Sequence, residues 1–382
     1  MTWLEINKKN LQNNFDILTQ YRSGPSSIGV VLKANAYGHG IAEVIPLLHS
    51  RMDTAYVMNL AEALAIRKVE NELQLGSKRI LIMGPTSWEA ILEASQQNID
   101  ICLHDFSYRE ILPSLREAKI SISVHVVIDT GLSREGFLPT TLPALFQDLK
   151  NYPNFKIQGI MSHFAHVEDI TEQDYARQQL KVFENAVADL KKELHLETLQ
   201  EHISASASFM TLPQAHKNSV RLGALIYGFW VSPEMKLSTK TLFSELPAIQ
   251  PVLTWKSQTK TIKYIQKGVS ISYGCTYRCE RDLWIAVFPV GYSDGYPRIA
   301  SYKAYVLIEG KRCPILGRIA MNYLMVDVSP ILRDNPTTSL TAVLLGKSGE
   351  ESISVQQLAD WSSSIPHEVV SRISPLLKRV VV

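Results

Sequence analysis

Cysteine is sparse in this sequence, with only four among 382 residues, at Cys102, Cys275, Cys279 and Cys313. Their scattered positions do not suggest a disulfide framework. The spacing of Cys275 and Cys279 would suit two metal ligands, but no second pair of cysteines or histidines accompanies them. We therefore interpret all four as structural thiols of a protein from a reducing cytoplasm, and we expect no metal site.

Long apolar runs and an excess of charge are also missing. No uninterrupted apolar stretch is long enough to span a bilayer, and the opening Met1–Asn7 lacks the basic and apolar regions of a signal peptide. The formal net charge is +2, which favours neither a nucleic acid nor an anionic membrane as a partner. With 46% hydrophobic and 20% charged residues, the chain has the balance of a globular cytoplasmic protein with a sizeable core.

Residues 8 to 235 alternate short apolar stretches with amphipathic helical segments. The clearest helix is Asp174–Leu194, whose large apolar side chains recur at helical spacing on one face. Eight strands are predicted, at Ile28–Leu32, Thr54–Met58, Arg79–Met83, Ile99–Leu103, Ile122–Ile128, Lys156–Ser162, Glu201–Ser206 and Val220–Tyr227. Eight βα units favour an α/β fold of the (β/α)8 TIM-barrel type. A doubly wound sheet is the weaker alternative because the number of strands fits closure.

After Pro233 the pattern changes to consecutive strands with turns between them, beginning with a long strand predicted at Val252–Ile265. Such a run predicts a second, mainly β domain at the C-terminus. We accordingly expect residues 1–235 to form the barrel and residues 236–382 to form the β domain. Residues 1–7 precede the barrel pattern and are candidates for pairing with the second domain.

Polar residues cluster where the predicted barrel strands end, which is where TIM barrels carry their active sites. Lys33 ends the first strand, and a lysine that is partly desolvated there would have a lowered pKa and act as an amine nucleophile. Further along the chain come Asp129–Gly136 after the fifth strand, His163 after the sixth, Ser206 at the seventh, and Arg221–Ala224 in the eighth. Each has an ordinary structural explanation alone, but their convergence on one barrel face favours an active site.

The segment Val30–Gly40, VVLKANAYGHG, closely resembles the signature of alanine racemases, in which the lysine holds pyridoxal 5'-phosphate (PLP) as a Schiff base. The resemblance continues through almost the whole chain, including Val269–Gly274, Pro289–Arg298 and Gly317–Asn322. It implies a cytoplasmic isomerase that uses PLP to interconvert L- and D-alanine by a two-base mechanism, supplying D-alanine for peptidoglycan. It also implies a homodimer in which the β domain of one subunit contributes to the active site of the other.

The resemblance assigns roles to individual residues. Lys33 and Tyr273 would be the two catalytic acid/base groups on opposite faces of the cofactor, with Tyr273 supplied by the neighbouring subunit. Arg221 would face the pyridine nitrogen, and His163 and Arg221 would network to the tyrosine. The other cofactor-binding residues would be Tyr37, Ser206, Gly223, Ala224 and His367, the substrate carboxylate would meet Arg134 and Met321, and the entry passage would be lined by Glu168, Tyr292, Arg298 and Arg318.

Three positions depart from the family pattern. Val127 stands where well-known members carry a carbamate-modified lysine that orients the substrate-binding arginine, Asn322 where aspartate is usual, and His367 where tyrosine is usual. Because a valine offers no hydrogen bond, we expect Arg134 to find another acceptor, such as a small anion, an ordered water or Glu135. We favour the small anion, because the space left by the lysine should be roomy and electropositive.

Three other functions remain as alternatives. A racemase for serine, or one of broad specificity, would use the same chemistry. The basic amino-acid decarboxylases share the barrel-plus-β architecture, but the sequence shows neither their cysteine-bearing motif nor an acidic partner for the ring nitrogen. PLP-carrier barrel proteins have no second domain, so Tyr273 and residues 240–382 argue against that function.

Overall fold

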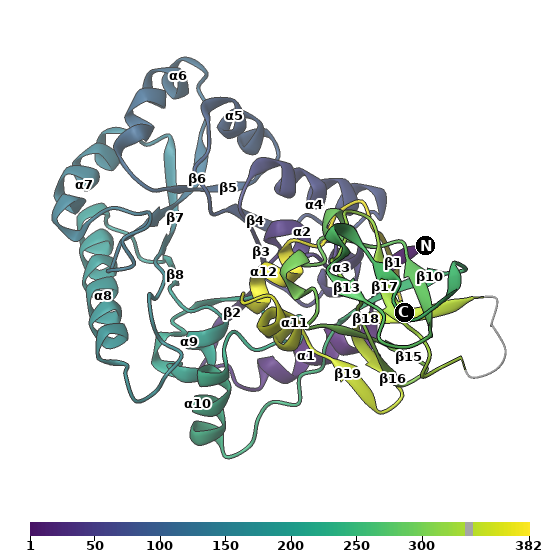
Figure 1. The fold of residues 1–382 in the computed structure, drawn as a ribbon. Coiled ribbons are helices and arrows are strands. Elements are labelled where there is room, and N and C mark those ends of the chain that lie inside the picture. Colours follow the sequence, from purple (N-terminus) through teal and green to yellow (C-terminus); the bar gives the residue numbers. More distant parts are fainter. Residues whose placement is uncertain (333–338) are drawn as a thin grey trace.

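Eight parallel strands form a barrel in the computed structural model, which describes residues 1–332 and 339–382 (Figure 1). Their bounds are β2 (Ser27–Val31), β3 (Thr54–Val57), β4 (Arg79–Ile82), β5 (Asp100–Leu103), β6 (Ile122–Val127), β7 (Phe155–Met161), β8 (Gln200–His202) and β9 (Ser219–Leu222). Neighbouring strands pair in the order β8-β7-β6-β5-β4-β3-β2-β9. A single bridge between Ala205 and Arg221 joins the two ends. The predicted TIM barrel is confirmed.

Helices cover the outside of this barrel, as α4 to α8 show in Figure 1. They are α1 (Lys8–Thr19), α3 (Ile41–Leu48), α4 (Leu60–Glu72), α5 (Trp88–Gln96), α6 (Leu112–Glu117), α7 (Leu142–Asn151), α8 (Asp174–Leu194), α9 (Ser206–Thr211) and α10 (Pro233–Phe243). Side chains that accept backbone N–H groups begin several of them: Asn59 caps α4 and Ser87 caps α5. In α8 the predicted apolar face is buried, including Phe183 and Leu190. None of the helices described is long and apolar enough to cross a membrane.

The C-terminal part is mainly β, as predicted. Its largest sheet has the order β16-β15-β18-β10-β1-β20, with β19 on β18, beside a sheet β11-β14-β17 and a hairpin β12-β13. The bounds are β1 (Thr2–Ile6), β10 (Leu253–Thr259), β11 (Ile262–Ile265), β12 (Ser270–Ile271), β13 (Tyr277–Arg278), β14 (Leu283–Phe288), β15 (Tyr305–Ile308), β16 (Lys311–Pro314), β17 (Leu324–Asp327), β18 (Leu340–Ser348), β19 (Glu351–Ile353) and β20 (Lys378–Val381). Two helices, α11 (Val355–Trp361) and α12 (Pro366–Ser371), complete it.

Both chain ends lie in this large sheet (Figure 1). Leu4 of β1 pairs with Trp255 of the antiparallel β10 and with Arg379 of the parallel β20. Leu4 and Trp255 are fully buried, so the N-terminal strand packs into the interior of the β-rich part before the chain enters the barrel.

Two predicted strands extend several residues too far. The segment Val220–Tyr227 remains a strand only to Leu222, because a turn follows in which the N–H of Ile226 donates to the carbonyl of Gly223 at 2.9 Å. The segment Glu201–Ser206 ends at His202, and Ser206 begins α9 instead. Buried apolar runs look alike in strands and in covered turns, so periodicity could not place these ends.

The predicted strand Val252–Ile265 is also wrong as a single element. It breaks after Thr259, where the side-chain oxygen of Thr259 accepts the N–H of Thr261 at 3.0 Å. The two halves, β10 and β11, then join different sheets. The break therefore places the two halves of one predicted strand in separate sheets of the β-rich part.

Candidate active site

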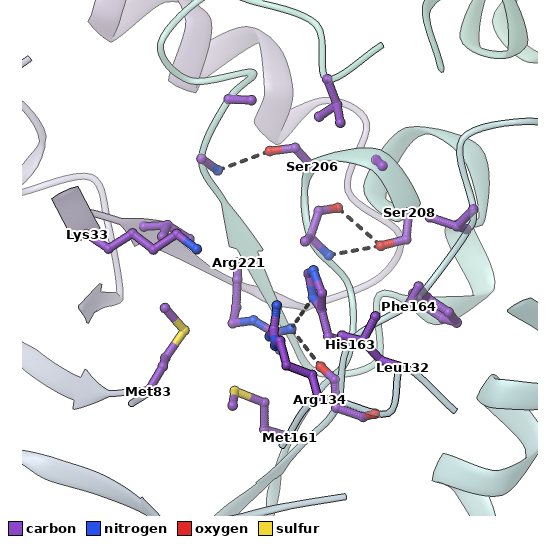
Figure 2. A pocket seen from close by; sticks show the side chains of 18 of the residues that line it. Lys33, Met83, Leu132, Arg134, Met161, His163, Phe164, Ser206, Ser208 and Arg221 are labelled. Carbon is purple, nitrogen blue, oxygen red and sulfur yellow. Dashed lines mark hydrogen bonds between the residues drawn. The ribbon is translucent and has the colours of Figure 1, made fainter. Parts of the chain in front are cut away.

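A pocket of about 390 Å³ opens at the C-terminal ends of the barrel strands. Figure 2 shows Lys33, Arg134, His163 and Arg221 converging in it from separate strands and loops. The predicted residues that line the pocket are Lys33, Tyr37, Arg134, His163, Ser206, Arg221, Gly223, Ala224 and His367. The structure therefore brings together residues that are more than 330 positions apart in the sequence.

Lys33 is presented by an unusual backbone turn, α2 (Lys33–Tyr37). Ala34, Asn35, Ala36 and Tyr37 all have positive φ values between 52° and 55°, a left-handed conformation that costs roughly 1–2 kcal/mol per residue. Backbone hydrogen bonds hold the turn, including one from Gly38 N–H to the Ala34 carbonyl at 2.9 Å. The chain thereby reverses directly after the lysine and leaves its side chain in the pocket.

The side chain of Glu62, on α4, holds this turn in place through hydrogen bonds to the backbone. Its carboxylate accepts the backbone N–H of Ala34 at 2.6 Å and that of Met58, which follows β3, at 2.8 Å. The ends of two neighbouring barrel strands are thus tied to one side chain. No sequence signal distinguished Glu62 from the other acidic residues of an exposed helix face.

Burial is the main cause that lowers the pKa of the Lys33 amine. The positive charges of Arg134 and Arg221 lower it further, while Glu62 and Glu135 oppose them. A lowered pKa leaves more of the amine unprotonated near neutral pH. The site therefore favours a lysine that reacts as a nucleophile or holds a proton only transiently.

A second cluster of polar groups lies above β8 and β9. The N–H of Gly223 donates to the side-chain oxygen of Ser206 at 3.0 Å. A Cβ atom at Gly223 would meet the Tyr37 hydroxyl at 2.8 Å, so only glycine permits this close approach. Burial raises the pKa of Tyr37 to about 12, which keeps its hydroxyl neutral and able to donate. Hydroxyl and backbone N–H donors at this place in a TIM barrel suit a phosphate group.

Arg221 lies on β9 at the floor of the pocket and is almost fully buried. Its Nη1 donates to the carbonyl of His202 at 2.6 Å, and its Nη2 donates to the carbonyl of Ser162 at 2.7 Å. Nη2 also lies 3.3 Å from Nδ1 of His163. Burial lowers the pKa of Arg221 to about 10, so the guanidinium remains charged at neutral pH.

His163 is held neutral by the same neighbours. Burial, with the charges of Arg221 and Arg134, lowers its pKa to about 3. Because an arginine can only donate, Nδ1 of His163 accepts from Arg221 and the ring proton resides on Nε2. The pair can orient a further hydroxyl but is unsuited to storing a proton near neutral pH.

Comparison with known proteins agrees with this geometry. The model of the alanine racemase N-terminal domain matches residues 6–230, and that of the C-terminal domain matches residues 252–381. This chain belongs to the alanine racemase family. It is 35% identical to the alanine racemase of Leptospira interrogans, covering 100% of this chain and 96% of that one. Alanine racemase 1 of Clostridium acetobutylicum is 32% identical, with 100% and 95% covered.

Solved structures lead to the same family. The structure of alanine racemase from Bacillus anthracis with bound L-Ala-P superposes with a TM-score of 0.89 at 27% identity. The match covers 100% of this chain and 95% of the other. The family predicted from the sequence motifs is therefore confirmed, and with it an isomerase of the alanine racemase type.

Two predicted site residues do not lie in this pocket. Tyr273 and Met321 belong to the β-rich part, where their side chains are 71% and 54% exposed. Of the predicted entry residues, Glu168 lines the pocket, whereas Tyr292, Arg298 and Arg318 do not. The resemblance assigns Tyr273 to the active site of the neighbouring subunit, so the pocket of its own chain is not where this tyrosine is expected.

The structure shows that His202, which was not predicted as a site residue, holds Arg221 in place beneath the pocket. This residue ends β8, is fully buried, and accepts from Nη1 of Arg221 on its Nδ1 at 3.0 Å. The predicted strand Glu201–Ser206 places His202 inside the strand, whereas the structure ends β8 at this residue and so brings it to the mouth of the barrel.

Proposed function

We propose that this chain is a PLP-dependent racemase that interconverts L- and D-alanine and so supplies D-alanine for peptidoglycan. The observation that carries the proposal is the Lys33 amine, whose pKa is lowered, in one pocket with Arg221 and with a cluster of phosphate-type donors. The names of the relatives support alanine as the substrate. A cytoplasmic location follows from this role.

The residues of the pocket fit PLP. The volume of the pocket lies within the range for cofactor sites. Ser206, Gly223 and Tyr37 would bind the phosphate, with Ala224 and His367 beside them, Arg221 would face the pyridine nitrogen, and Lys33 would carry the covalent link. When bound, PLP supplies an aldehyde for that link and a ring that delocalises the electrons left behind by the α-proton.

Arg221 restrains that chemistry. A carboxylate at this position would keep a ring nitrogen protonated, whereas the guanidinium has no acceptor and stays charged. Its N–H groups are also fixed on the carbonyls of His202 and Ser162. A cofactor ring whose nitrogen is not protonated would withdraw fewer electrons from the substrate's α-carbon. This favours return of the proton to the α-carbon over transamination.

The chain's own bases perform the proton transfers. Lys33 acts on one face of the substrate's α-carbon, and Tyr273 of a second subunit acts on the other. The tyrosine is accompanied by large exposed apolar side chains of the same part of the chain: Tyr292, Ile299, Tyr302, Met321 and Tyr323. Large apolar side chains that are exposed in one chain become buried when an interface with a second chain forms, which supports a homodimer with two shared sites.

The proposed division of the chain follows from this arrangement. Residues 1–235 would provide the cofactor site and residues 236–382 the surface that completes the partner's site. The matches of the two family models, 6–230 and 252–381, support that division. The strand formed by residues 2–6 pairs with β10 and β20, which would fasten the two parts together.

The reaction is tested by incubating the enzyme with PLP and L-alanine in D₂O. A racemase exchanges the α-proton for deuterium and forms D-alanine. Release of CO₂ instead would indicate a decarboxylase, and the absence of both would contradict an enzymatic role. Serine and larger amino acids, assayed for chiral inversion under the same conditions, test the alternative of a broader substrate range.

A further inference from the structure

A row of buried polar side chains runs through the interior of the barrel, where branched apolar residues are usual. It begins at Asp100, the first residue of β5, and continues through His125 of β6 and His202 at the end of β8 to Arg221 of β9. Both histidines are fully buried, and Asp100 and Arg221 are 5% and 4% exposed. The row thus leads from the N-terminal end of the barrel to the floor of the active-site pocket.

Contacts join each member of the row to the next. Arg221 Nη1 lies 3.0 Å from His202 Nδ1, and His202 Nε2 lies 2.8 Å from His125 Nδ1. His125 Nε2 lies 3.5 Å from Asp100 Oδ2, which is a charge contact rather than a hydrogen bond, and the ring nitrogen has no other partner in the part of the chain that the structure describes. Room for His125 comes from Gly159 of β7, where a Cβ atom would lie 2.2 Å from Nδ1 of the ring.

Both ends of the row favour the same direction of hydrogen bonding. Since a guanidinium only donates, Arg221 favours a His202 ring whose Nδ1 accepts and whose proton is on Nε2, and the Asp100 carboxylate favours a proton on Nε2 of His125. That proton is donated to Nδ1 of His125, which places the proton of His125 on Nε2. Burial lowers the pKa of both histidines, so each carries a single proton, and the last proton, on Nε2 of His125, lies beside the Asp100 carboxylate.

Asp100 is the negative charge at the other end. Although burial opposes its ionisation, contacts with His125 and Arg79 hold its pKa below the usual value. Nε of Arg79 donates to Asp100 Oδ2 at 2.8 Å and anchors the carboxylate at the barrel's N-terminal end. Among the described residues, Arg221 has no carboxylate of its own in contact. Asp100 is the acidic group to which the row connects it.

We propose that Asp100 is a positioning residue for the active site, which acts through His125 and His202 to fix both ring tautomers and the orientation of the Arg221 guanidinium. The tautomers are a property of this chain alone. The consequence for turnover rests on the proposed function, because Arg221 then faces the cofactor ring. A buried polar network holds its side chains rigidly when its groups are paired, whereas loss of one member leaves buried groups unsatisfied.

The first test measures the tautomers directly. Protein labelled with ¹⁵N in its histidine rings is observed by NMR near neutral pH, and His125→Gln and His202→Gln variants assign the signals. We expect neutral rings protonated on Nε2 for both residues. A ring protonated on Nδ1, or a doubly protonated ring, would overturn the proposal whatever the activity of the variants.

The second test uses Asp100→Asn, which keeps the shape of the side chain and removes its charge. We expect tautomers protonated on Nδ1 to become populated and kcat/KM for alanine to fall by roughly 2- to 30-fold. The matched control is Asp53→Asn, since Asp53 also lies at the N-terminal end of the barrel, where it accepts the N–H of Ile28 at 2.7 Å. The control should change neither quantity.

Asp100→Glu, which restores a carboxylate, should recover the wild-type tautomers. Unchanged tautomers in Asp100→Asn would overturn the proposal, as would altered tautomers with unchanged kcat/KM. If the wild-type protein proved not to racemise alanine at all, the proposed function would fail while the tautomer measurement would still decide the structural part of the inference.

Discussion

Arg134 and Glu135, neighbours in the sequence, form a two-point ion pair in the active-site pocket. Nη2 of Arg134 donates to Oε1 of Glu135 at 2.7 Å, and Nε of Arg134 donates to Oε2. Val127 occupies the position at which well-known family members carry a modified lysine. It is buried in the wall of the same pocket. Of the acceptors that we considered for Arg134, the structure provides the carboxylate, although a small anion was our preference.

This pair predicts a shift in the titration of Lys33. Glu135 raises the pKa of the Lys33 amine and Arg134 lowers it, so Glu135→Gln removes one of the two negative charges that oppose the arginines and lowers the pKa further. The amine of the variant should then lose its proton at a lower pH. The rate of PLP uptake by cofactor-free enzyme, followed by absorbance across pH, should have its midpoint at a lower pH than in the wild type.

The control for this shift is Glu93→Gln, which removes the same charge from α5 outside the pocket. It should leave the midpoint in place. A midpoint that stays constant or rises in Glu135→Gln would show that Glu135 does not act on the lysine.

Lys33 itself should be the point of attachment of PLP. Borohydride reduction of the holoenzyme should fix the cofactor to the peptide that contains Lys33, as read by mass spectrometry. Lys33→Ala should lose the covalent link and reduce racemisation to background, because the nucleophile and one of the two bases are removed together. Labelling of any other lysine would refute the assignment.

Tyr273→Phe tests the second base. Loss of a positioned acid/base group typically costs about 10²–10⁴-fold in rate, and we expect that loss with PLP binding unchanged, since Tyr273 does not line the pocket of its own chain. Mixing Tyr273→Phe with Lys33→Ala subunits should restore part of the activity, because one of the two shared sites in a heterodimer would be intact. If proven subunit exchange restored nothing, the proposal of sites shared between subunits would be wrong.

The sequence was sufficient for the barrel and for most of the pocket. Short apolar strands followed by polar residues placed Lys33, His163 and Arg221 correctly at one end of the barrel, because strand direction alone determines which residues meet there. Strand ends were less certain. Beyond Leu222 the apolar run continues into a covered turn, and its burial could not be told from that of a strand.

Contacts between distant segments could not be predicted. Asp100, His125 and His202 each lie in a separate strand, and nothing in their spacing reveals that they form one row. The segment that follows Lys33 forms a left-handed turn whose four positive-φ residues include no glycine. Tertiary contacts, such as that of Glu62 with Ala34, stabilise the turn against its local preference.

The proposed phosphate cradle, formed by Ser206, Gly223 and Tyr37, depends on the absence of a side chain at Gly223. In Gly223→Ala the new methyl group would lie 2.8 Å from the Tyr37 hydroxyl and 3.0 Å from its Cζ. The buried Tyr37 ring packs against Tyr227 and His367, with ring centroids 5.2 and 5.7 Å apart. These contacts restrict its movement away from a new methyl group. A Tyr37 hydroxyl displaced by the methyl group would no longer donate to the phosphate, and loss of a hydrogen bond to a charged group costs about 1.5–3 kcal/mol, which corresponds to a roughly 10- to 150-fold weaker affinity for PLP.

Equilibrium titration of cofactor-free Gly223→Ala with PLP would measure this loss. Gly76→Ala is the matched control, because a Cβ atom at Gly76 would meet nothing within 4 Å and the residue does not have a positive φ. The control should bind PLP as the wild type does. Equal affinity of Gly223→Ala and wild type would mean that the phosphate is bound away from Tyr37 and Gly223, and the cradle would have to be sought among other residues of the pocket.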